Sequence, residues 1–496
     1  MMISQILSDA RRLEAERGAR ITESERPGFH LSSYTGWMND PNGFTYYNGQ
    51  YHMFYQYHPY KSQWGPMHWG HAVSRDLLHW EYLPAALAPD RYYDEDGCFS
   101  GSALPLPDGR LLLMYTGVRK ELQPDGRMRE VQVQCMAAGD GTDFEKYPGN
   151  PVLSENDLPA GASRFDFRDP KMFIGSDGVY RCVIGSRPAD TSGQILLYKS
   201  RDGLHWQFEK ILAENRNRFG KMWECPDFFS LDGKQVLLTS PQDMLSQGFE
   251  YHAGNGTLCL IGSYDEANEE FTEETIHSID YGIDFYAPQT VLMPDGRRVM
   301  IGWMQNWDAC EIREPDSPWA GQMSLPRELF LRNGRLCQRP ILELAKLRSG
   351  RVEYHDVAVS GRLELPGVDG RMVDMEIRVR PKDPGKLYSK FAVHFAENEQ
   401  FYTSFRYRPY EGTVKLDRNF SGSRRAILHH RRCFVGNDRA ELRFRMILDQ
   451  YSVEVFIDDG EKVMTATMYT DRVADGISFY TEGEAVMDIV KYDLRP

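Results

Sequence analysis

Three carboxylates in the chain lie at the same distance from a turn glycine. Asp40, Asp169 and Glu224 each precede by nine residues a glycine that closes a predicted β-turn, and the same offset selects Ser100 and Ala287. Carboxyl groups that converge repel one another, so one can stay protonated as an acid while another stays ionised as a nucleophile. Glycoside cleavage requires such a pair. A single aspartate before a turn would more simply cap its own backbone, whereas three at one offset favour catalysis.

The turn glycines belong to an internal repeat, which predicts how the carboxylates are brought together. Five segments share an Asp-Gly or Asn-Gly turn followed by a β-rich stretch. Their glycines are Gly49, Gly109, Gly178, Gly233 and Gly296, spaced by 60, 69, 55 and 63 residues. Such units predict the four-stranded blades of a five-bladed β-propeller, whose inner strands converge on one end of a channel. An irregular all-β fold or a β-sandwich with coincidental turns is the alternative.

The whole chain is predicted to be all-β apart from its start, and it divides into four parts. Residues 1–24 form an N-terminal helical extension, with apolar residues at helical spacing. Residues 25–337 form the five-bladed β-propeller, which carries the catalytic site. Residues 338–351 read as a linker helix, and residues 352–496 alternate in the manner of an antiparallel β-sandwich.

Composition narrows the class of partner. The formal net charge is −14, which argues against a nucleic-acid partner, because such proteins present a basic face. The eight cysteines are scattered without a CxxC pair, which predicts free thiols rather than a disulfide or zinc framework. We expect no membrane span and no signal peptide, since neither a long apolar run nor an apolar leader occurs. These features predict a cytoplasmic protein.

The segments around the carboxylates carry side chains suited to a sugar. Aromatic rings that stack on sugar faces and polar groups that bind hydroxyls are the usual components of such a site, although core packing is the commoner role of any one ring. The candidates are Trp37, Trp64, Trp69, Tyr286, Trp303, Asn39, Gln56, Ser100 and Arg168. The pair His68 and His71 resembles a metal motif only superficially, and neither a phosphate-binding glycine loop nor a Gly-x-Ser-x-Gly elbow is present.

At these residues the sequence resembles glycoside hydrolase family 32, the invertase and fructan-hydrolase family. Residues 37–43 (WMNDPNG) match its first signature, residues 168–170 (RDP) its second and residues 224–227 (ECPD) its third. Lesser motifs are matched at residues 99–102 (FSGS) and 284–289 (DFYAPQ). The resemblance covers nearly all of the chain after residue 25, and the three signatures in order are highly specific.

The resemblance implies a five-bladed propeller with a β-sandwich and retaining cleavage of terminal β-D-fructofuranosides. Asp40 would be the nucleophile, Glu224 the acid/base and Asp169 the transition-state stabiliser, with the Asp40 and Glu224 carboxyls about 5–5.5 Å apart. No metal and no organic cofactor would be needed. The residues that the family pattern places around the substrate are Asn39, Gln56, Trp64, Phe99, Ser100, Arg168, Tyr286 and Trp303.

Several alternatives stay open from the sequence. Sucrose, sucrose 6-phosphate and short fructo-oligosaccharides all fit as substrates, and an exo-fructan hydrolase or a fructosyltransferase is the alternative enzyme. The related five-bladed arabinanases and xylosidases also use three carboxylates, but with inversion. A non-catalytic sugar-binding propeller is disfavoured by the intact triad. A homodimer is left open, with the sandwich as its surface, and the N-terminal helix could pack on either domain.

Overall fold

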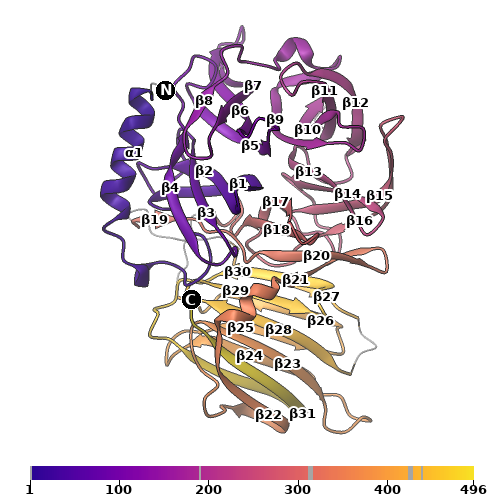
Figure 1. The fold of residues 1–496 in the computed structure, drawn as a ribbon. Helices are drawn as coiled ribbons and strands as arrows, with labels where there is room; N and C mark the ends of the chain where they lie inside the picture. Colours follow the sequence, from indigo (N-terminus) through magenta and orange to yellow (C-terminus); the bar gives the residue numbers. More distant parts are fainter. Residues whose placement is uncertain (1–2, 189–191, 311–316, 423–427, 437–439) are drawn as a thin grey trace.

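The computed structural model describes residues 3–188, 192–310, 317–422, 428–436 and 440–496. These residues form a five-bladed β-propeller followed by a β-sandwich (Figure 1), as the repeat and the strand alternation predicted. Two short 3-10 turns, η1 (Glu23–Glu25) and η2 (Glu155–Asp157), lie outside the sheets. Among the described residues, no helix has the length and apolar character needed to cross a membrane.

The N-terminal helix α1 (Gln5–Gly18) covers the outer edge of the first blade (Figure 1). It begins after Ser4, whose hydroxyl accepts a hydrogen bond from the N–H of Leu7 and so caps the helix. At the edge strand, the backbone N–H of Ala85 donates to the Glu14 carboxylate and Arg11 donates to the Ala85 carbonyl. The helix therefore satisfies backbone groups that an exposed strand edge would leave unpaired.

Each blade is a four-stranded antiparallel sheet built from strands in chain order. Blade 1 contains β1 (Gly36–Tyr47), β2 (Gln50–His58), β3 (His68–Ser74) and β4 (Trp80–Leu87). Blade 2 contains β5 (Gly97–Pro105), β6 (Leu111–Leu122), β7 (Met128–Gly139) and β8 (Phe144–Lys146). Blade 3 contains β9 (Ala162–Ile174), β10 (Tyr180–Pro188), β11 (Gln194–Ser200) and β12 (Gln207–Glu214).

The last two blades complete the ring. Blade 4 contains β13 (Trp223–Leu231), β14 (Lys234–Pro241), β15 (Leu258–Asp265) and β16 (Glu270–Ser278). Blade 5 contains β17 (Tyr286–Leu292), β18 (Arg298–Trp303), β20 (Arg327–Arg332) and β21 (Arg335–Pro340). The short strand β19 (Trp319–Ala320) leaves blade 5 and pairs in parallel with β1, so it joins the last blade to the first.

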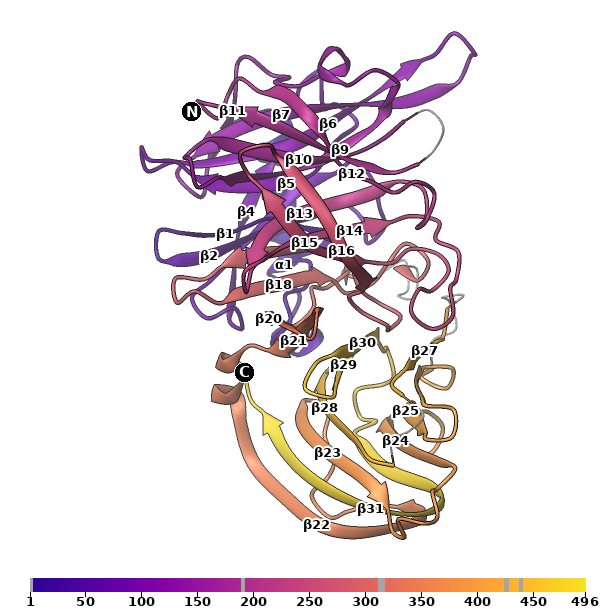
Figure 2. The same ribbon diagram turned by 90° about the vertical axis from the view of Figure 1, so that its right-hand side faces the viewer.

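The second part of the chain is one long sheet folded into two layers (Figure 2). Its strands are β22 (Arg348–Leu363), β23 (Val373–Pro381), β24 (Lys390–Glu397), β25 (Thr403–Arg408), β26 (Thr413–Asp417), β27 (His430–Phe434), β28 (Leu442–Asp449), β29 (Ser452–Ile457), β30 (Lys462–Thr467) and β31 (Gly476–Leu494). Strand β31 pairs with β24 along its first half and with β23 along its second half, so it runs through both layers. The alternating inward residues of the two layers form one apolar core.

A single 3-10 turn connects the two parts. The turn η4 (Leu342–Leu347) follows β21 and leads directly into β22. The linker segment predicted from the sequence therefore contains one 3-10 turn flanked by the ends of two strands. The four-part division of the chain, with its boundaries at residues 24, 337 and 351, remains our proposal.

Buried ion pairs lie between the propeller and the sandwich. Arg327 of blade 5 donates to the Glu454 carboxylate of the sandwich at 2.8 Å, and both side chains are fully buried. His30 lies between the two carboxylates of Asp449 and Glu454, at 2.7 and 3.0 Å. Burial alone would lower the pKa of His30, but these two partners raise it to about 9. Breaking one partner of such a pair leaves an uncompensated buried charge, so the network fixes how the two parts dock.

Candidate active site

The five innermost strands of the propeller share an irregularity at the same end of the channel. Each is the first strand of its blade, and these strands contact one another around the ring. Each is interrupted by a β-bulge, at Met38/Pro41, Phe99/Gly101, Arg168/Lys171, Glu224/Asp227 and Tyr286/Gln289. Because a bulge bends the strand and re-aims its side chains, the five bulges present a ring of side chains to the channel mouth.

Several bulge residues adopt a backbone conformation that side-chain-bearing residues rarely use. The φ angles are 66° at Asp169, 49° at Cys225 and 51° at Ala287. Each of these three residues is followed by a proline, which lacks the N–H that a regular ladder would need and is therefore tolerated at a bulge. Left-handed backbone at non-glycine residues costs free energy and is concentrated at functional sites. The local sequence thus fixes a strained conformation at three of the five inner strands.

The strand register corrects one part of the sequence argument. The bulge begins nine residues before the turn glycine at Asp169 and Ala287, but eight residues before it in blade 4, where Cys225 occupies the bulge. Glu224 is therefore equivalent to Arg168 and Tyr286, not to Asp169. The shared offset of nine arose because the hairpin of blade 4 is one residue shorter. Glu224 still reaches the site, and its side chain contacts those of Arg168 and Tyr286.

The Asp40 carboxylate is buried and held by neutral donors. The Ser100 hydroxyl donates to Oδ2 at 2.8 Å, and the Asn39 amide donates to Oδ1 at 3.1 Å. The Asn39 side chain is itself oriented by Trp37, whose indole N–H donates to it at 2.8 Å. Burial raises the pKa of Asp40 to about 6, and the negative charge of Glu224 adds to the effect. The carboxylate is thus oriented without a paired cation.

The third carboxylate, Asp169, is joined to Asp40 through a cysteine. The backbone N–H of Cys225 donates to Asp169 Oδ2 at 2.9 Å. The Cys225 thiol lies 3.5 Å from Asp40 Oδ2 and 3.6 Å from Asp169 Oδ2. Burial raises the pKa of this thiol well above its ordinary value, so it stays protonated and acts as a weak donor between the two acids. Burial, followed by the charge of Glu224, also raises the pKa of Asp169.

Glu224 has partners of a different kind on its two oxygens. Arg168 donates to Oε1 through Nε at 3.0 Å and through Nη2 at 2.9 Å. The Tyr286 hydroxyl lies 2.6 Å from Oε2 and 2.9 Å from the Ser240 carbonyl oxygen, so its one proton can serve either acceptor. Glu224 is therefore oriented by a cation and a phenol, whereas Asp40 is oriented by neutral groups. Two carboxylates in different environments are the arrangement that separates an acid from a nucleophile.

The three carboxylates line one cavity of about 310 Å³. Of the other predicted substrate residues, the same cavity is lined by Asn39, Gln56, Trp64, Phe99, Ser100 and Arg168. Trp64 is 45% exposed at the rim, and its ring meets Phe99 edge-on with 6.1 Å between centroids. The site thus combines a polar floor with an aromatic rim, as sugar-binding cavities do.

Tyr286 and Trp303 lie behind this lining and not on it. Both side chains are fully buried. The Tyr286 hydroxyl makes a hydrogen bond to the Glu224 carboxylate. The Trp303 ring packs between the rings of Trp37 and Trp307, with 5.9 and 5.0 Å between centroids. Neither residue is among those that line the cavity, and the cleft role that the sequence analysis gave to Tyr286 and Trp303 stays a prediction.

Other lining residues were missed by sequence reasoning. They are Glu130, Gln132, Phe165, Asp166, Gln242 and Trp307. Gln132 accepts a hydrogen bond from Arg168 Nη1 at 3.3 Å, and Asp166 accepts one from the same nitrogen at 3.4 Å. Asp166 lies two residues before Arg168, a period-two spacing that could have placed it on the same strand face. Glu130 and Gln132 come from β7, for which no motif gave a signal.

The described part of the chain contains no group of three or more His, Cys, Asp or Glu side chains arranged to hold a metal ion. The carboxylates of the cavity are occupied by hydrogen-bond donors from Ser100, Asn39, Arg168, Tyr286 and Cys225. This set of partners is suited to proton transfer and nucleophilic attack.

Comparison with known proteins identifies the family of the chain. Residues 30–340 match the Glycosyl hydrolases family 32 N-terminal domain, and residues 343–495 match the family 32 C-terminal domain. The chain belongs to glycoside hydrolase family 32. A raffinose invertase of Escherichia coli is 37% identical, with 98% of each chain covered. A sucrose-6-phosphate hydrolase of Escherichia coli is 36% identical, with 96% of this chain and 97% of that protein covered.

A solved structure of the family supports the fold in detail. A variant of the family 32 β-fructofuranosidase of Bombyx mori, in complex with sucrose, superposes with a TM-score of 0.83. It is 34% identical, and 100% of this chain and 99% of that chain are covered. The match includes both the propeller and the sandwich.

Proposed function

We propose that the chain is a retaining β-fructofuranosidase that cleaves sucrose-type substrates through a covalent fructosyl-enzyme. One observation carries the proposal. In a family 32 chain, Asp40 and Glu224 come from different blades to the same cavity, and they have different partners there. The sugar-cleaving activity rests on the family, and the residue roles rest on this geometry.

Asp40 is the nucleophile in this proposal. Its pKa of about 6 leaves the carboxylate ionised near neutral pH, and among the described residues no cation pairs with it to withdraw its charge. Ser100 and Asn39 fix both oxygens, so the attacking lone pair is pre-oriented toward the anomeric carbon. Attack on the fructosyl C2 forms an ester bond to Asp40 and breaks the bond to the leaving oxygen.

Glu224 is the acid and then the base. Its proton passes to the leaving oxygen in the first step, and its carboxylate takes a proton from water in the second. The Tyr286 hydroxyl suits both stages, since it can donate to the carboxylate or turn to the Ser240 carbonyl when Glu224 is protonated. Arg168 holds the side chain in one orientation throughout.

Asp169 is the stabiliser of the transition state. It lies on the strained bulge of β9, and its carboxylate is fixed by the Cys225 backbone N–H. A fixed negative charge beside an oxocarbenium-like centre lowers the barrier because it need not reorganise during the reaction. Hydrogen bonds to the fructose hydroxyls would be its direct contacts.

The size of the cavity favours short substrates. At about 310 Å³ it lies at the lower end of the range for small-molecule sites, which suits one terminal fructosyl unit and a small leaving group. The relatives include an invertase and a sucrose-6-phosphate hydrolase, so the phosphorylation state of the leaving group is a separate question. A cytoplasmic location and a homodimer remain predictions from the sequence.

The test is to follow the anomeric configuration of the first-formed fructose by NMR during hydrolysis of sucrose. Retention is expected. Inversion would contradict Asp40 as nucleophile and would favour the single-displacement chemistry of the related five-bladed families. Rates on sucrose, kestose and inulin measured in parallel give the chain-length preference, and a preference for inulin would replace the sucrase assignment by an exo-fructan hydrolase.

A further inference from the structure

The segment between β2 and β3 carries part of the aromatic rim of the candidate active site. Residues 59–66 form neither helix nor strand. Trp64 lies in this segment, lines the cavity and is 45% exposed. Its ring contacts Phe99 edge-on, with 6.1 Å between the ring centroids. Because a half-exposed ring is not fixed by packing alone, its orientation depends on how the backbone beside it is held.

Two histidines outside the segment hold the backbone on both sides of Trp64. His58, the last residue of β2, donates through Nδ1 to the Gln63 carbonyl at 2.7 Å. His68, the first residue of β3, donates through Nδ1 to the Pro66 carbonyl at 3.0 Å. The first contact is made to the residue directly before Trp64, and the second to the residue two positions after it.

The two acceptors fix the chemical form of both rings. A carbonyl oxygen can only accept, so each histidine carries a proton on Nδ1. Burial lowers the pKa of His58, and it lowers the pKa of His68 to about 4. Both rings are therefore neutral at pH 7, as the tautomer with Nδ1–H. Protonation would add a proton at Nε2 and leave the contact to the carbonyl in place, so this support does not depend on pH.

A glycine brings the segment against the His58 ring. A Cβ atom at Gly65 would lie 2.4 Å from His58 Cε1, far closer than such atoms approach one another. The Tyr60 ring packs against His58 and His68, with 5.7 and 5.6 Å between centroids. These four residues form one packed unit next to Trp64. None of them lines the active-site cavity, so they reach a substrate only through residues that do.

We propose that His58 is a positioning residue, which together with His68 holds Trp64 against the fructosyl unit of the substrate. The proposal rests on the proposed function and adds a residue to its machinery. A ring that is already held in the free protein loses little freedom when the substrate binds, so the substrate and the transition state gain equally. Loss of such uniform binding raises KM and leaves kcat unchanged.

The experiment measures kcat and KM for sucrose in the wild type and in His58→Ala. KM is expected to rise about fivefold with kcat within about twofold, the usual effect of losing one partly buried hydrogen bond. His58→Asn is expected to recover most of this loss, because the asparagine amide can donate from nearly the position of Nδ1. Gly65→Ala is expected to raise KM as His58→Ala does, since the added Cβ displaces the ring.

A double-mutant cycle tests whether His58 acts through Trp64. Trp64→Ala alone is expected to raise KM at least tenfold, since it removes a ring from the cavity lining. If His58 serves to place this ring, His58→Ala adds nothing to KM in the Trp64→Ala background. Effects that add in the double variant would overturn the proposal, because His58 would then act independently of Trp64. A fall in kcat with KM unchanged in His58→Ala would overturn it as well.

His79→Ala is the matched control. His79 lies on the same blade, and its Nδ1 likewise makes a 2.7 Å hydrogen bond, to Asp76 in the connection between β3 and β4. No change in KM is expected for it. A KM that His58→Ala leaves within twofold of the wild type, or that His79→Ala raises equally, would overturn the proposal. If the wild type does not hydrolyse sucrose, the proposed function itself fails, which is a different outcome from an active enzyme whose KM does not respond to His58.

Discussion

Replacing Asp40 by asparagine should abolish hydrolysis and stabilise the fold. The change removes the nucleophile, so kcat on sucrose is expected to fall by about 10⁴ or more. Its effect on stability follows from the pKa. The folded protein raises the pKa of Asp40 from 3.8 to about 6, chiefly through burial and then through the charge of Glu224. A raised carboxyl pKa means that ionisation weakens the folded state, fully so above the folded pKa and not at all below the unfolded one.

The size of this effect depends on pH. A shift from 3.8 to about 6 corresponds to a cost of roughly 3 kcal/mol at pH 7, which falls below about 1 kcal/mol at pH 4. Asp40→Asn is expected to recover that cost as an increase in the free energy of unfolding. Urea unfolding of both proteins at pH 7 and pH 4 measures it. A variant that is less stable than the wild type at pH 7, or equally stabilised at both pH values, would refute the electrostatic reasoning.

Three further predictions concern the partners of the site and of the interface. Glu224→Gln is expected to lower kcat on sucrose at least 10³-fold and to slow the first-turnover release of fluoride from fructosyl fluoride far less, because fluoride leaves with little help from an acid; pre-steady-state release of the leaving group from both substrates tests this. Tyr286→Phe is expected to lower kcat about tenfold with KM nearly unchanged, since it removes the 2.6 Å contact to Glu224 but no cavity lining. The pKa of His30, raised to about 9, should stabilise the protein by roughly 3 kcal/mol below pH 6.5, and this contribution should be lost as the pH rises through 9.

Each of these outcomes has a control. Equal losses in the first-turnover release of glucose from sucrose and of fluoride from fructosyl fluoride in Glu224→Gln would remove its role as acid. A rise in KM without a fall in kcat for Tyr286→Phe would place the ring in substrate binding. Urea unfolding between pH 6 and pH 9.5 tests His30, with His30→Gln as the comparison. A wild-type decline no steeper than that of the variant would show that the histidine is not charged between Asp449 and Glu454.

The propeller could be predicted from the sequence because its repeats are local. A turn such as Asp295-Gly296 needs glycine at a positive φ, 90° in the structure, and the apolar strands on either side reveal the hairpin. Five such units define the blades without any knowledge of long-range contacts. The β-sandwich follows from the period-two alternation of its strands, for example in β29.

The shared offset from the turn glycine reflects a true structural equivalence for some site residues and a coincidence of hairpin length for Glu224. Asp169 and Ala287 occupy the same bulge position, but Glu224 shares the turn offset only because its hairpin is shorter. Register depends on pairing between strands, which an offset along one strand does not contain. Tyr286 lies on an inner strand, but its hydroxyl contacts Glu224 and its side chain does not line the cavity, so its role in the cleft stays a prediction.

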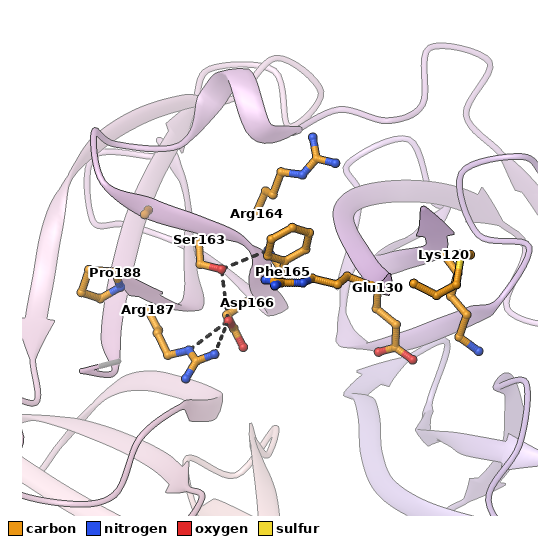
Figure 3. Close-up of a pocket in the computed structure, with 11 residues that line it drawn as sticks. Lys120, Glu130, Ser163, Arg164, Phe165, Asp166, Arg187 and Pro188 are labelled. Atoms are coloured by element: carbon orange, nitrogen blue, oxygen red, sulfur yellow. Dashed lines mark hydrogen bonds and ion pairs between the residues drawn. The ribbon is translucent and has the colours of Figure 1, made fainter. Parts of the chain in front are cut away.

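Residues supplied by neighbouring strands could not be found in this way. Glu130 lies near the start of β7, the third strand of its blade, and reaches the cavity because the hairpin of β6 and β7 extends past the blade (Figure 2). The clustering of Arg129, Arg164 and Arg187 likewise joins three segments that are distant in sequence. Their charges are visible in the sequence, but only the fold brings the three side chains to the lining of one cavity (Figure 3).

The most direct measurement is to identify the covalent intermediate. Glu224→Ala, which lacks the base needed for the second step, is incubated with fructosyl fluoride, quenched in acid and analysed by peptide mass spectrometry. The account predicts a fructosyl ester on Asp40, absent from the Asp40→Asn, Glu224→Ala double variant. A fructosyl group on any other residue, or turnover of the fluoride without an adduct and with inversion, would contradict it.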